Sequence, residues 1–217
     1  MSGKNIPLKH VGILFLVMLM VLSACGSHNG GLTEKEAKHR AEDALKNILS
    51  VEAKPENISL DKKQNAYAQE RTDSGMSRDA KEYWIANCSF EESDDYQIWL
   101  EAATGKIIHI SRYPVGWLSE NEGMGDFMER AAGAVSEQTI HDNAVQYCEK
   151  AGYPVAESDA PLQYKESITL QKPDGSRTEW TAEYYQTYVT YEDGTGATVA
   201  LFADDGSLLE AWFSPYE

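Results

Sequence analysis

The side chains that could support acid–base or metal chemistry are few and scattered along this sequence. His39, His109 and His141 are far from one another, and no His-Glu-x-x-His, Gly-x-Ser-x-Gly, Walker or Cys-x-x-Cys pattern occurs. Scattered histidines of this kind are typical of a protein surface rather than of a catalytic or metal site. We therefore predict surface histidines, no catalytic residue, no cofactor and no metal ion. A small hydrolase with an unrecognised site is the enzymatic alternative.

Two further groups have the composition of a site without its spacing. The acidic run at residues 91–95 lacks the alternating oxygen ligands of a calcium loop, so a solvated turn is the favoured interpretation. Cys88 alternates with apolar residues of an expected strand, and Cys148 shares a helical stripe with Ala144. Both cysteines are predicted to be small core residues, with a disulfide between them as the alternative outside the cytoplasm.

A short positive and then apolar segment begins the chain. Lys4 and Lys9 precede the uninterrupted apolar run at residues 11–22. This run is about a dozen residues long, whereas a helix that spans a membrane needs about 20. Its length and the polar sequence that follows are typical of a cleaved signal peptide, which we assign to residues 1–24.

The residues at the end of this segment, Leu22-Ser23-Ala24-Cys25, resemble the lipobox of bacterial lipoprotein signal peptides. The resemblance implies transfer of diacylglyceryl to the Cys25 sulfur, cleavage before Cys25, and often acylation of the new amino terminus, with palmitate among the fatty acids. Two or three acyl chains anchor a protein stably. Residues 25–31 then form the lipidated Cys and a short tether, on the extracytoplasmic face of the cell membrane. An ordinary secretory signal and an uncleaved anchor are the alternatives.

The charge of the chain limits its partners. Its 217 residues hold 19 Lys+Arg against 35 Asp+Glu, a formal net charge of −16. A field of that sign repels phosphate backbones, so nucleic acid is excluded as a partner. With 42% hydrophobic residues, the chain is nevertheless able to bury a core.

One sequence pattern occurs twice in the remainder of the chain. The two occurrences align at an offset of 103 residues where they begin and of 101 residues where they end. Near-equal offsets indicate two copies of one unit. The aligned segments are residues 32–45 with 135–148, and residues 98–108 with 199–209.

Each copy combines one helix with several strands. Thr33 and Glu36 form a capping box before an apolar stripe, and Ser136 caps a second helix. Asp-Gly and similar turns between alternating apolar runs predict antiparallel hairpins after each helix. We expect the α+β class, as two tandem modules that each pack one helix on an antiparallel β-sheet of about four strands. The predicted modules are residues 32–113 and 135–217, joined by a linker at 114–134.

The capped helix and the closing hairpin of each copy resemble the PepSY family, small modules of protease propeptides, sporulation proteins and bacterial lipoproteins. The family usually has an aspartate shortly before the turn glycine; the second copy supplies Asp204, whereas the first has Ala103. The resemblance implies a helix packed across a curved antiparallel sheet, no catalysis, and binding or restraint of envelope proteins. The hairpins that carry it are Ile98-x-Leu100-x-Ala102-x-Thr104-Gly105-Lys106-Ile107-Ile108 and Val199-x-Leu201-x-Ala203-Asp204-Asp205-Gly206-x-Leu208-Leu209.

Aromatic residues gather in the strand expected at residues 177–190 and just after it. Tyr184 and Tyr188 alternate onto one face, and Tyr185 and Tyr191 onto the other. One helix covers only one face of a sheet, and exposed tyrosine suits recognition. Cross-strand aromatic pairing that only stabilises the sheet is the favoured interpretation. The alternative hypothesis is that the uncovered face binds a protein or glycan through Tyr185 and Tyr191.

These features predict an extracytoplasmic, membrane-anchored lipoprotein that acts without catalysis. Its expected activity is to bind or inhibit an envelope protein such as a protease or a cell-wall enzyme. A structural or chaperone-like accessory subunit of an envelope assembly is the alternative, because a shape of this kind does not by itself select a partner.

Overall fold

A computed structural model gives the structure of the chain. The residues that it describes are 31–64, 81–114, 118, 135–171 and 177–213; for residues 166–182 this covers the backbone and its pairing only. Two compact units are present, residues 1–31 and 32–217, and the fold below is that of the second. Cys25, the predicted signal peptide and nearly all of the predicted linker at 114–134 therefore lie outside the described residues.

Two helices are capped as the sequence predicts. Helix α2 (Glu34–Asn47) begins after Thr33, whose side chain accepts a hydrogen bond from the Glu36 amide while the Glu36 carboxylate accepts one from the Thr33 amide. Helix α4 (Glu137–Lys150) begins after Ser136, whose hydroxyl accepts from the Thr139 amide. These bonds satisfy amide groups that the first turn of a helix leaves without partners. The predicted caps are confirmed.

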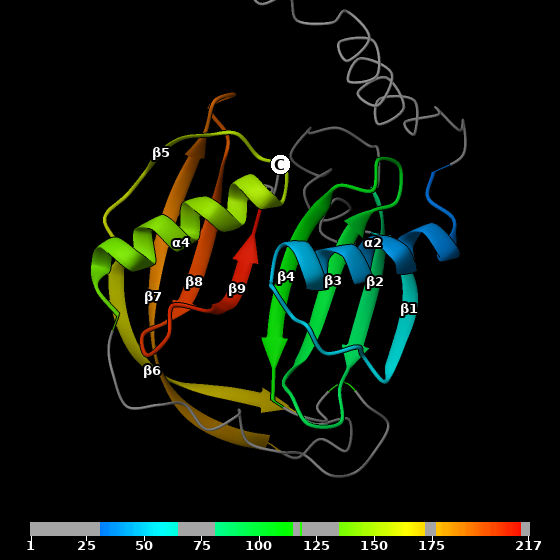
Figure 1. The fold of residues 1–217 in the computed structure, drawn as a ribbon, viewed down its shortest axis with the longest axis horizontal. Helices are drawn as coiled ribbons and strands as arrows, with labels where there is room; N and C mark the ends of the chain where they lie inside the picture. The colour runs from blue at the N-terminus through cyan, green and yellow to red at the C-terminus, as the bar shows by residue number, and fades with distance from the viewer. Residues whose placement is uncertain (1–30, 65–80, 115–117, 119–134, 172–176, 214–217) are drawn as a thin grey trace, which may run out of the picture. The chain divides into compact units, whose positions relative to one another are not determined.

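The strands form one antiparallel sheet. Within the described residues it has nine strands, in the order β1-β2-β3-β4-β9-β8-β7-β5, and β6 also pairs with β7 (Figure 1). The short strand β5 was not predicted from the sequence. The strands are β1 (Asn57–Gln64), β2 (Glu82–Ser89), β3 (Asp95–Glu101), β4 (Ile107–Tyr113), β5 (Val155–Ser158), β6 (Leu162–Gln171), β7 (Arg177–Tyr191), β8 (Gly196–Phe202) and β9 (Leu208–Trp212).

The expected α+β class, with two helices and an antiparallel sheet, is found. The prediction gave each helix a sheet of its own, whereas β4 pairs with β9 and joins the strands into a single sheet. This joint pairs His109 with Trp212, and Ile110 with Ala211. Pairing satisfies backbone groups that β4 and β9 would otherwise expose as sheet edges.

Two hairpins of the sheet have the same geometry at an offset of 101 residues. The amide of Gly105 donates to Glu101 O at 2.8 Å, and that of Gly206 donates to Phe202 O at 2.9 Å. Both glycines have positive φ, 73° and 69°, which favours glycine over residues that carry a Cβ. A register shift follows Trp99 in the first hairpin and Ala200 in the second. Two further bonds match, Leu32 N–H to Ala102 O and Val135 N–H to Ala203 O.

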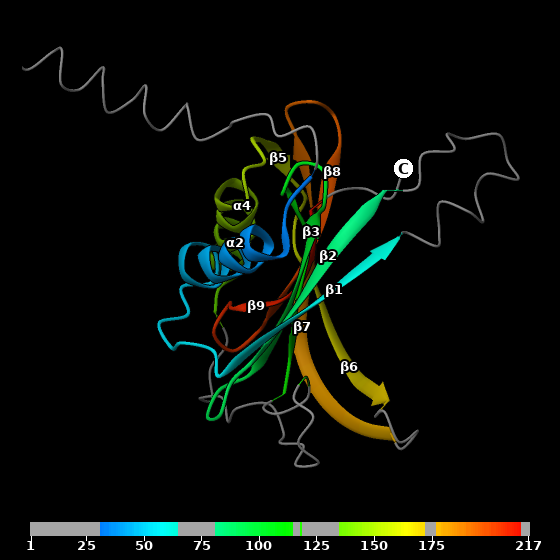
Figure 2. The ribbon, with the colours of Figure 1, turned by 90° about the vertical axis from the view of Figure 1, so that its right-hand side faces the viewer.

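Both helices pack on one face of the sheet, as Figure 2 shows. The core beneath them is continuous across the β4–β9 joint, because residues from both sides of the joint belong to one buried cluster. Among the described residues, no helix lies on the opposite face of β3, β4 and β9, and we call it the helix-free face. Core residues nearest the joint are Ile98, Leu100, Ile110, Val199, Leu201 and Ala211.

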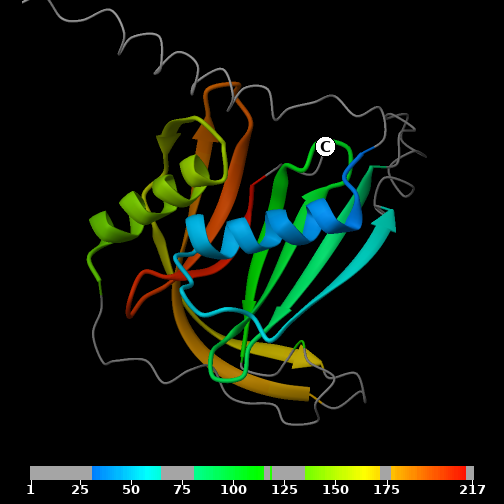
Figure 3. The ribbon, with the colours of Figure 1, turned by 45° about the vertical axis from the view of Figure 1, so that its right-hand side comes forward.

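Strands β6 and β7 extend beyond the rest of the sheet (Figure 3). β7 pairs with β8 over residues 184–190, while its pairing with β6 continues down to Arg177. Residues 177–183 of β7 therefore pair with β6 alone and form a two-stranded ribbon.

Candidate functional site

The helix-free face at the β4–β9 joint carries a cluster of aromatic and polar side chains. Ile98 and Ile110 lie in the core under the helices. Because successive side chains of a strand point to opposite faces, Trp99 and His109 lie on the helix-free face. The same alternation, with Ala211 in the core, places Glu210 and Trp212 there too. We call these residues, Trp99, His109, Glu210 and Trp212, the joint cluster.

His109 lies between the two tryptophans of the joint cluster. Its ring stacks on Trp212 with centroids 3.7 Å apart and meets Trp99 edge-on at 5.5 Å. The residue is only 3% exposed, so the prediction of a surface histidine is wrong here. Burial lowers the pKa of His109 below its ordinary value, against the opposing hydrogen bond and charge of Glu210. The ring is therefore neutral near pH 7.

Glu210 is fixed by two donors on one oxygen. His109 Nε2 lies 3.0 Å from Glu210 Oε1, and Trp212 Nε1 donates to the same atom at 3.1 Å. Because a carboxylate only accepts, the first contact assigns the neutral-ring proton of His109 to Nε2. Nδ1 is then a buried acceptor, and no hydrogen bond reaches it in the described part of the chain. The Glu210 side chain is 46% exposed.

Amide side chains hold Trp99 in place. Trp99 Nε1 donates to Gln97 Oε1 at 2.7 Å, and Gln97 Nε2 donates to Asn87 Oδ1 at 2.8 Å. Tyr83 lies on the other side of Trp99, with ring centroids 6.3 Å apart. Trp99 is partly exposed. Its N–H is already bonded, so the indole offers its π surface to other groups.

The joint cluster has the composition of a recognition site. Tryptophan gives large contact area with few rotatable bonds, and a carboxylate held by two N–H groups has a fixed direction. Trp99 lies on β3 and His109 on β4, whereas Glu210 and Trp212 lie on β9. The site therefore exists only when β4 and β9 are paired.

The tyrosines that the sequence favoured lie elsewhere. Tyr185 and Tyr191 are 7% and 3% exposed and belong to the core under the helices. The Tyr191 hydroxyl donates to Phe213 O at 2.8 Å. The expectation that they lie on the uncovered face is wrong: α4 packs on the face that holds them, and Tyr188, 43% exposed, lies on the other.

The acidic turn is solvated only in its first half. Glu91 and Glu92 are exposed, whereas Asp94 and Asp95 are buried. Asp94 Oδ2 accepts from Arg112 Nε at 2.6 Å, and Asp95 Oδ1 accepts from the amide of Phe90 at 3.0 Å. The prediction of a fully solvated turn is wrong, because these carboxylates have a cation and amide donors that come from other segments.

Arg112 links the two halves of the sheet that meet where β4 pairs with β9. Besides Asp94, it donates from its terminal nitrogen to Ser207 Oγ at 2.8 Å, in the hairpin between β8 and β9. Its guanidinium also lies over the rings of Tyr96 and Phe202, at 5.7 and 5.5 Å from the centroids.

Both cysteines of the described residues are free and buried. The prediction of core residues is confirmed, and the alternative disulfide between Cys88 and Cys148 is not present. Burial is the main cause that raises the pKa of Cys88 to about 12 and that of Cys148 to about 11. Thiols of this kind are poor nucleophiles at neutral pH.

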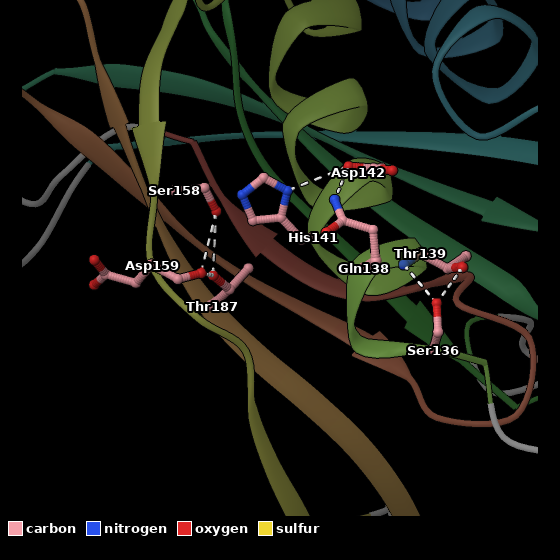
Figure 4. Close-up of polar contacts among 8 residues, drawn as sticks. All are labelled: Ser136, Gln138, Thr139, His141, Asp142, Ser158, Asp159 and Thr187. Atoms are coloured by element: carbon pink, nitrogen blue, oxygen red, sulfur yellow. Dashed lines mark hydrogen bonds and ion pairs between the residues drawn. The ribbon is translucent and has the colours of Figure 1, made fainter.

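A group of Ser, His and Asp side chains lies beside α4 and β5 (Figure 4). His141 Nδ1 lies 3.3 Å from Asp142 Oδ1, and Ser158 Oγ lies 3.4 Å from Thr187 Oγ1. Among the described residues no hydrogen bond joins Ser158 to His141, so the nucleophile–base contact of a catalytic triad is not made. Instead Thr187 Oγ1 donates to Asp159 O at 2.8 Å and ties the chain after β5 to β7.

Sequence reasoning missed the joint cluster, because its members come together only through the pairing of β4 with β9. In sequence, His109 stands alone inside an apolar strand, and Trp212 follows it by more than a hundred residues. The alternation of Trp99 and Trp212 with core residues was the one local signal.

In the described part of the chain no helix is long and apolar enough to cross a membrane, and no three His, Cys, Asp or Glu side chains are grouped to hold a metal. Comparison of the chain with protein-family models, curated proteins and solved structures finds no match.

Proposed function

We propose that the chain is a lipoprotein anchored through Cys25 on the extracytoplasmic face of the cell membrane, where it binds or restrains an envelope protein without catalysis. The joint cluster is the proposed binding site. The observation that carries the proposal is a partly exposed pair of tryptophans with a carboxylate held by His109 and Trp212, on a sheet face that carries no helix within the described residues. Tryptophan side chains that become buried on binding contribute a large share of the binding energy of protein interfaces.

The body of the protein is proposed to consist of two PepSY-like modules, residues 32–113 and 135–217. Three pairs of equivalent features support this reading: the capped helices, the glycine turns at Gly105 and Gly206, and the register shifts that precede them, the last two at an offset of 101 residues. In this proposal the modules associate through their last strands, β4 and β9. The binding site then belongs to the pair of modules and to neither alone.

An accessory subunit of an envelope assembly is the second candidate function. The two-stranded ribbon of β6 and β7 favours it, because this ribbon extends beyond β8 and leaves the outer edge of β6 unpaired within the described residues. Such an edge is a place where another chain can add a strand.

Photo-crosslinking in native membranes tests the proposed function. A photoreactive amino acid in place of Gln97, beside the joint cluster, is expected to capture one defined envelope protein, identified by mass spectrometry. The same amino acid in place of Lys38, which is exposed on α2, is the matched control and is expected not to capture that protein. Equal capture from both positions, or none from Gln97, would contradict a binding site on the helix-free face.

The proposed anchor has a separate test. Replacing Cys25 with Ser removes the thiol that accepts the lipid, and we expect the protein to leave the membrane fraction. A Cys88→Ser variant, which changes a buried thiol of the folded part, is the control and is expected to stay with the membrane. Retention of the Cys25→Ser variant in the membrane would contradict lipid anchoring.

A further inference from the structure

We infer that the joint cluster binds an arginine side chain of its protein partner, with the guanidinium hydrogen-bonded to Glu210 and stacked on the indole of Trp99. The inference rests on the proposed function, since it specifies the chemistry of the partner at the proposed site. It makes the helix-free face a receptor for a basic segment.

The first support is the state of the Glu210 carboxylate. Its Oε1 accepts from two N–H groups, while the side chain remains 46% exposed. No lysine or arginine of the described chain lies within 4.0 Å of it. Among the described residues, its ionisable hydrogen-bond partner is His109, whose pKa burial lowers, so this neighbour stays neutral near pH 7. Glu210 is therefore held in a fixed position with no Lys or Arg partner among the described residues.

Other carboxylates of the same sheet form ion pairs with lysine side chains, and Glu210 does not do so among the described residues. Glu82 lies 2.7 Å from Lys62 Nζ, and Glu183 lies 2.7 Å from Lys165 Nζ. Those carboxylates already have cations within the chain. Glu210 accepts from His109 and Trp212 instead, and no Lys or Arg among the described residues pairs with it.

The second support is the aromatic surroundings. An indole face attracts a cation, and a guanidinium can stack on it while it forms paired hydrogen bonds with a carboxylate. The ring centroids of Trp99 and Trp212 are 5.7 Å apart, and Trp212 Nε1 donates to Glu210. The fold itself uses this chemistry at Arg112, which contacts both a carboxylate and aromatic rings.

A neutral glycan fits the site less well. Sugars need several directional hydrogen-bond partners around an aromatic platform, whereas the amides next to Trp99 are already engaged. Gln97 and Asn87 bond to each other, and Gln97 also accepts from Trp99. In addition, the net charge of −16 raises the local concentration of a basic partner and gives a neutral one no such advantage.

Peptide titration tests this inference on the purified full-length chain in non-ionic detergent at physiological ionic strength. The probe is a capped tetra-arginine peptide, and its isosteric control is tetra-citrulline, which keeps the shape and loses the charge. Chitotetraose serves as the glycan probe. We expect the arginine peptide to bind, and the other two to show no binding at the same concentrations.

Two matched variants locate the binding. Glu210→Gln removes the charge but keeps an oxygen that accepts from His109 and Trp212, and it is expected to weaken binding of the arginine peptide about tenfold. Glu192→Gln makes the same charge change in the exposed turn after β7 and is expected to leave affinity within about twofold, as a surface charge far from the site should. Thermal unfolding of both variants checks that they are folded. If Glu210→Gln does not fold, Trp99→Phe, which keeps an aromatic ring, is expected to weaken binding severalfold.

Three outcomes of the peptide titration would overturn the inference. Equal binding of tetra-citrulline shows that charge is not recognised, equal loss in Glu210→Gln and Glu192→Gln shows a diffuse charge effect, and binding of chitotetraose in place of the arginine peptide shows a glycan site. Failure of the proposed function is distinguished from failure of the inference by the crosslinking experiment. If the proposed function is wrong, crosslinking from Gln97 captures no protein, regardless of the result of the peptide titration. Capture of a partner whose crosslinked segment lacks arginine overturns only the inference.

Discussion

Ile110 and Ala211 lie directly opposite each other where β4 pairs with β9, and they occupy equivalent positions in two hairpins of the same geometry. Their neighbours follow the same rule, because His109 faces Trp212 and Ser111 faces Glu210. The two strands therefore meet about a local twofold axis through the Ile110–Ala211 pair. This axis brings dissimilar residues together on the helix-free face, and the joint cluster is the result.

The joint should contribute strongly to stability. Ile110 is fully buried at its centre, and we expect Ile110→Ala to lower the free energy of unfolding by about 2–5 kcal/mol, from lost burial and the cavity left behind. Leu162→Ala changes a side chain that is 62% exposed and is expected to cost less than about 0.5 kcal/mol. Urea unfolding followed by circular dichroism measures both. Similar losses in the two variants would argue against a packed joint.

The buried ion pair between Arg112 and Asp94 should be sensitive to removal of one partner. Arg112→Met leaves the fully buried Asp94 carboxylate without its cation, and we expect a loss of about 3–5 kcal/mol in the free energy of unfolding. Combining it with Asp94→Asn removes the stranded charge, so the double variant should be more stable than the sum of the single losses predicts. A double-mutant cycle from urea unfolding measures this coupling, and simple additivity would contradict it.

Stability should fall in mild acid because of His109. Its pKa in the folded protein is lowered by burial, whereas in the unfolded chain it has the ordinary value of about 6.5. Below pH about 6.5 the unfolded state therefore binds more protons, and the free energy of unfolding decreases as pH falls. We expect His109→Gln to flatten this decrease between pH 7.5 and about 5.

His39→Gln is the control for the pH experiment. This histidine lies on α2 with 73% of its side chain exposed, and its replacement is expected to keep the decrease of the wild type. Urea unfolding at several pH values gives the comparison. An unchanged pH dependence in His109→Gln would mean that the buried ring does not contribute.

The turn glycine at Gly105 should tolerate alanine worse than Gly152 does. Both have positive φ, 73° and 90°, so alanine strains the backbone at each. A Cβ at Gly105 would also lie 2.9 Å from a methyl carbon of Leu32, whereas nothing lies within 4 Å of one at Gly152. We expect Gly152→Ala to cost about 1 kcal/mol and Gly105→Ala measurably more, by thermal unfolding. Equal costs would show that Leu32 moves aside freely.

Cys88 and Cys148 should resist thiol reagents in the folded protein. Burial shields both sulfurs and raises their pKa to about 12 and about 11, so little thiolate forms at neutral pH. Maleimide labelling is expected to be slow in buffer and fast in urea, with mass spectrometry assigning the modified residue. Rapid native labelling of either cysteine would contradict its burial.

Features set by neighbouring residues were predictable from the sequence. Thr33 with Glu36 and Ser136 mark the helix starts because a cap needs only residues within one turn. The Gly105 and Gly206 turns were predictable for the same reason, since a tight hairpin requires a residue tolerant of positive φ.

Features set by distant partners were not predictable. Asp94 looks like a surface residue until Arg112 is placed beside it, and His109 looks isolated until β9 brings Glu210 and Trp212 to it. The alternation of side chains likewise separates the two faces of β7, but it does not show which face α4 covers. Tyr185 and Tyr191 were therefore assigned to the uncovered face, whereas they lie in the core. The local pattern of residues along one sequence does not indicate that β4 pairs with β9.

The twofold character of the β4–β9 pairing has a consequence for self-association. When two equivalent strand edges pair about a twofold axis, both edges are used and the assembly is closed. A head-to-tail contact between different edges instead leaves one edge unpaired, and that edge can pair with the next copy without limit. In this chain β4 and β9 pair with each other, so these edges are not available to another copy. The geometry of the joint is thus a safeguard against stacking of one molecule on another along these strands.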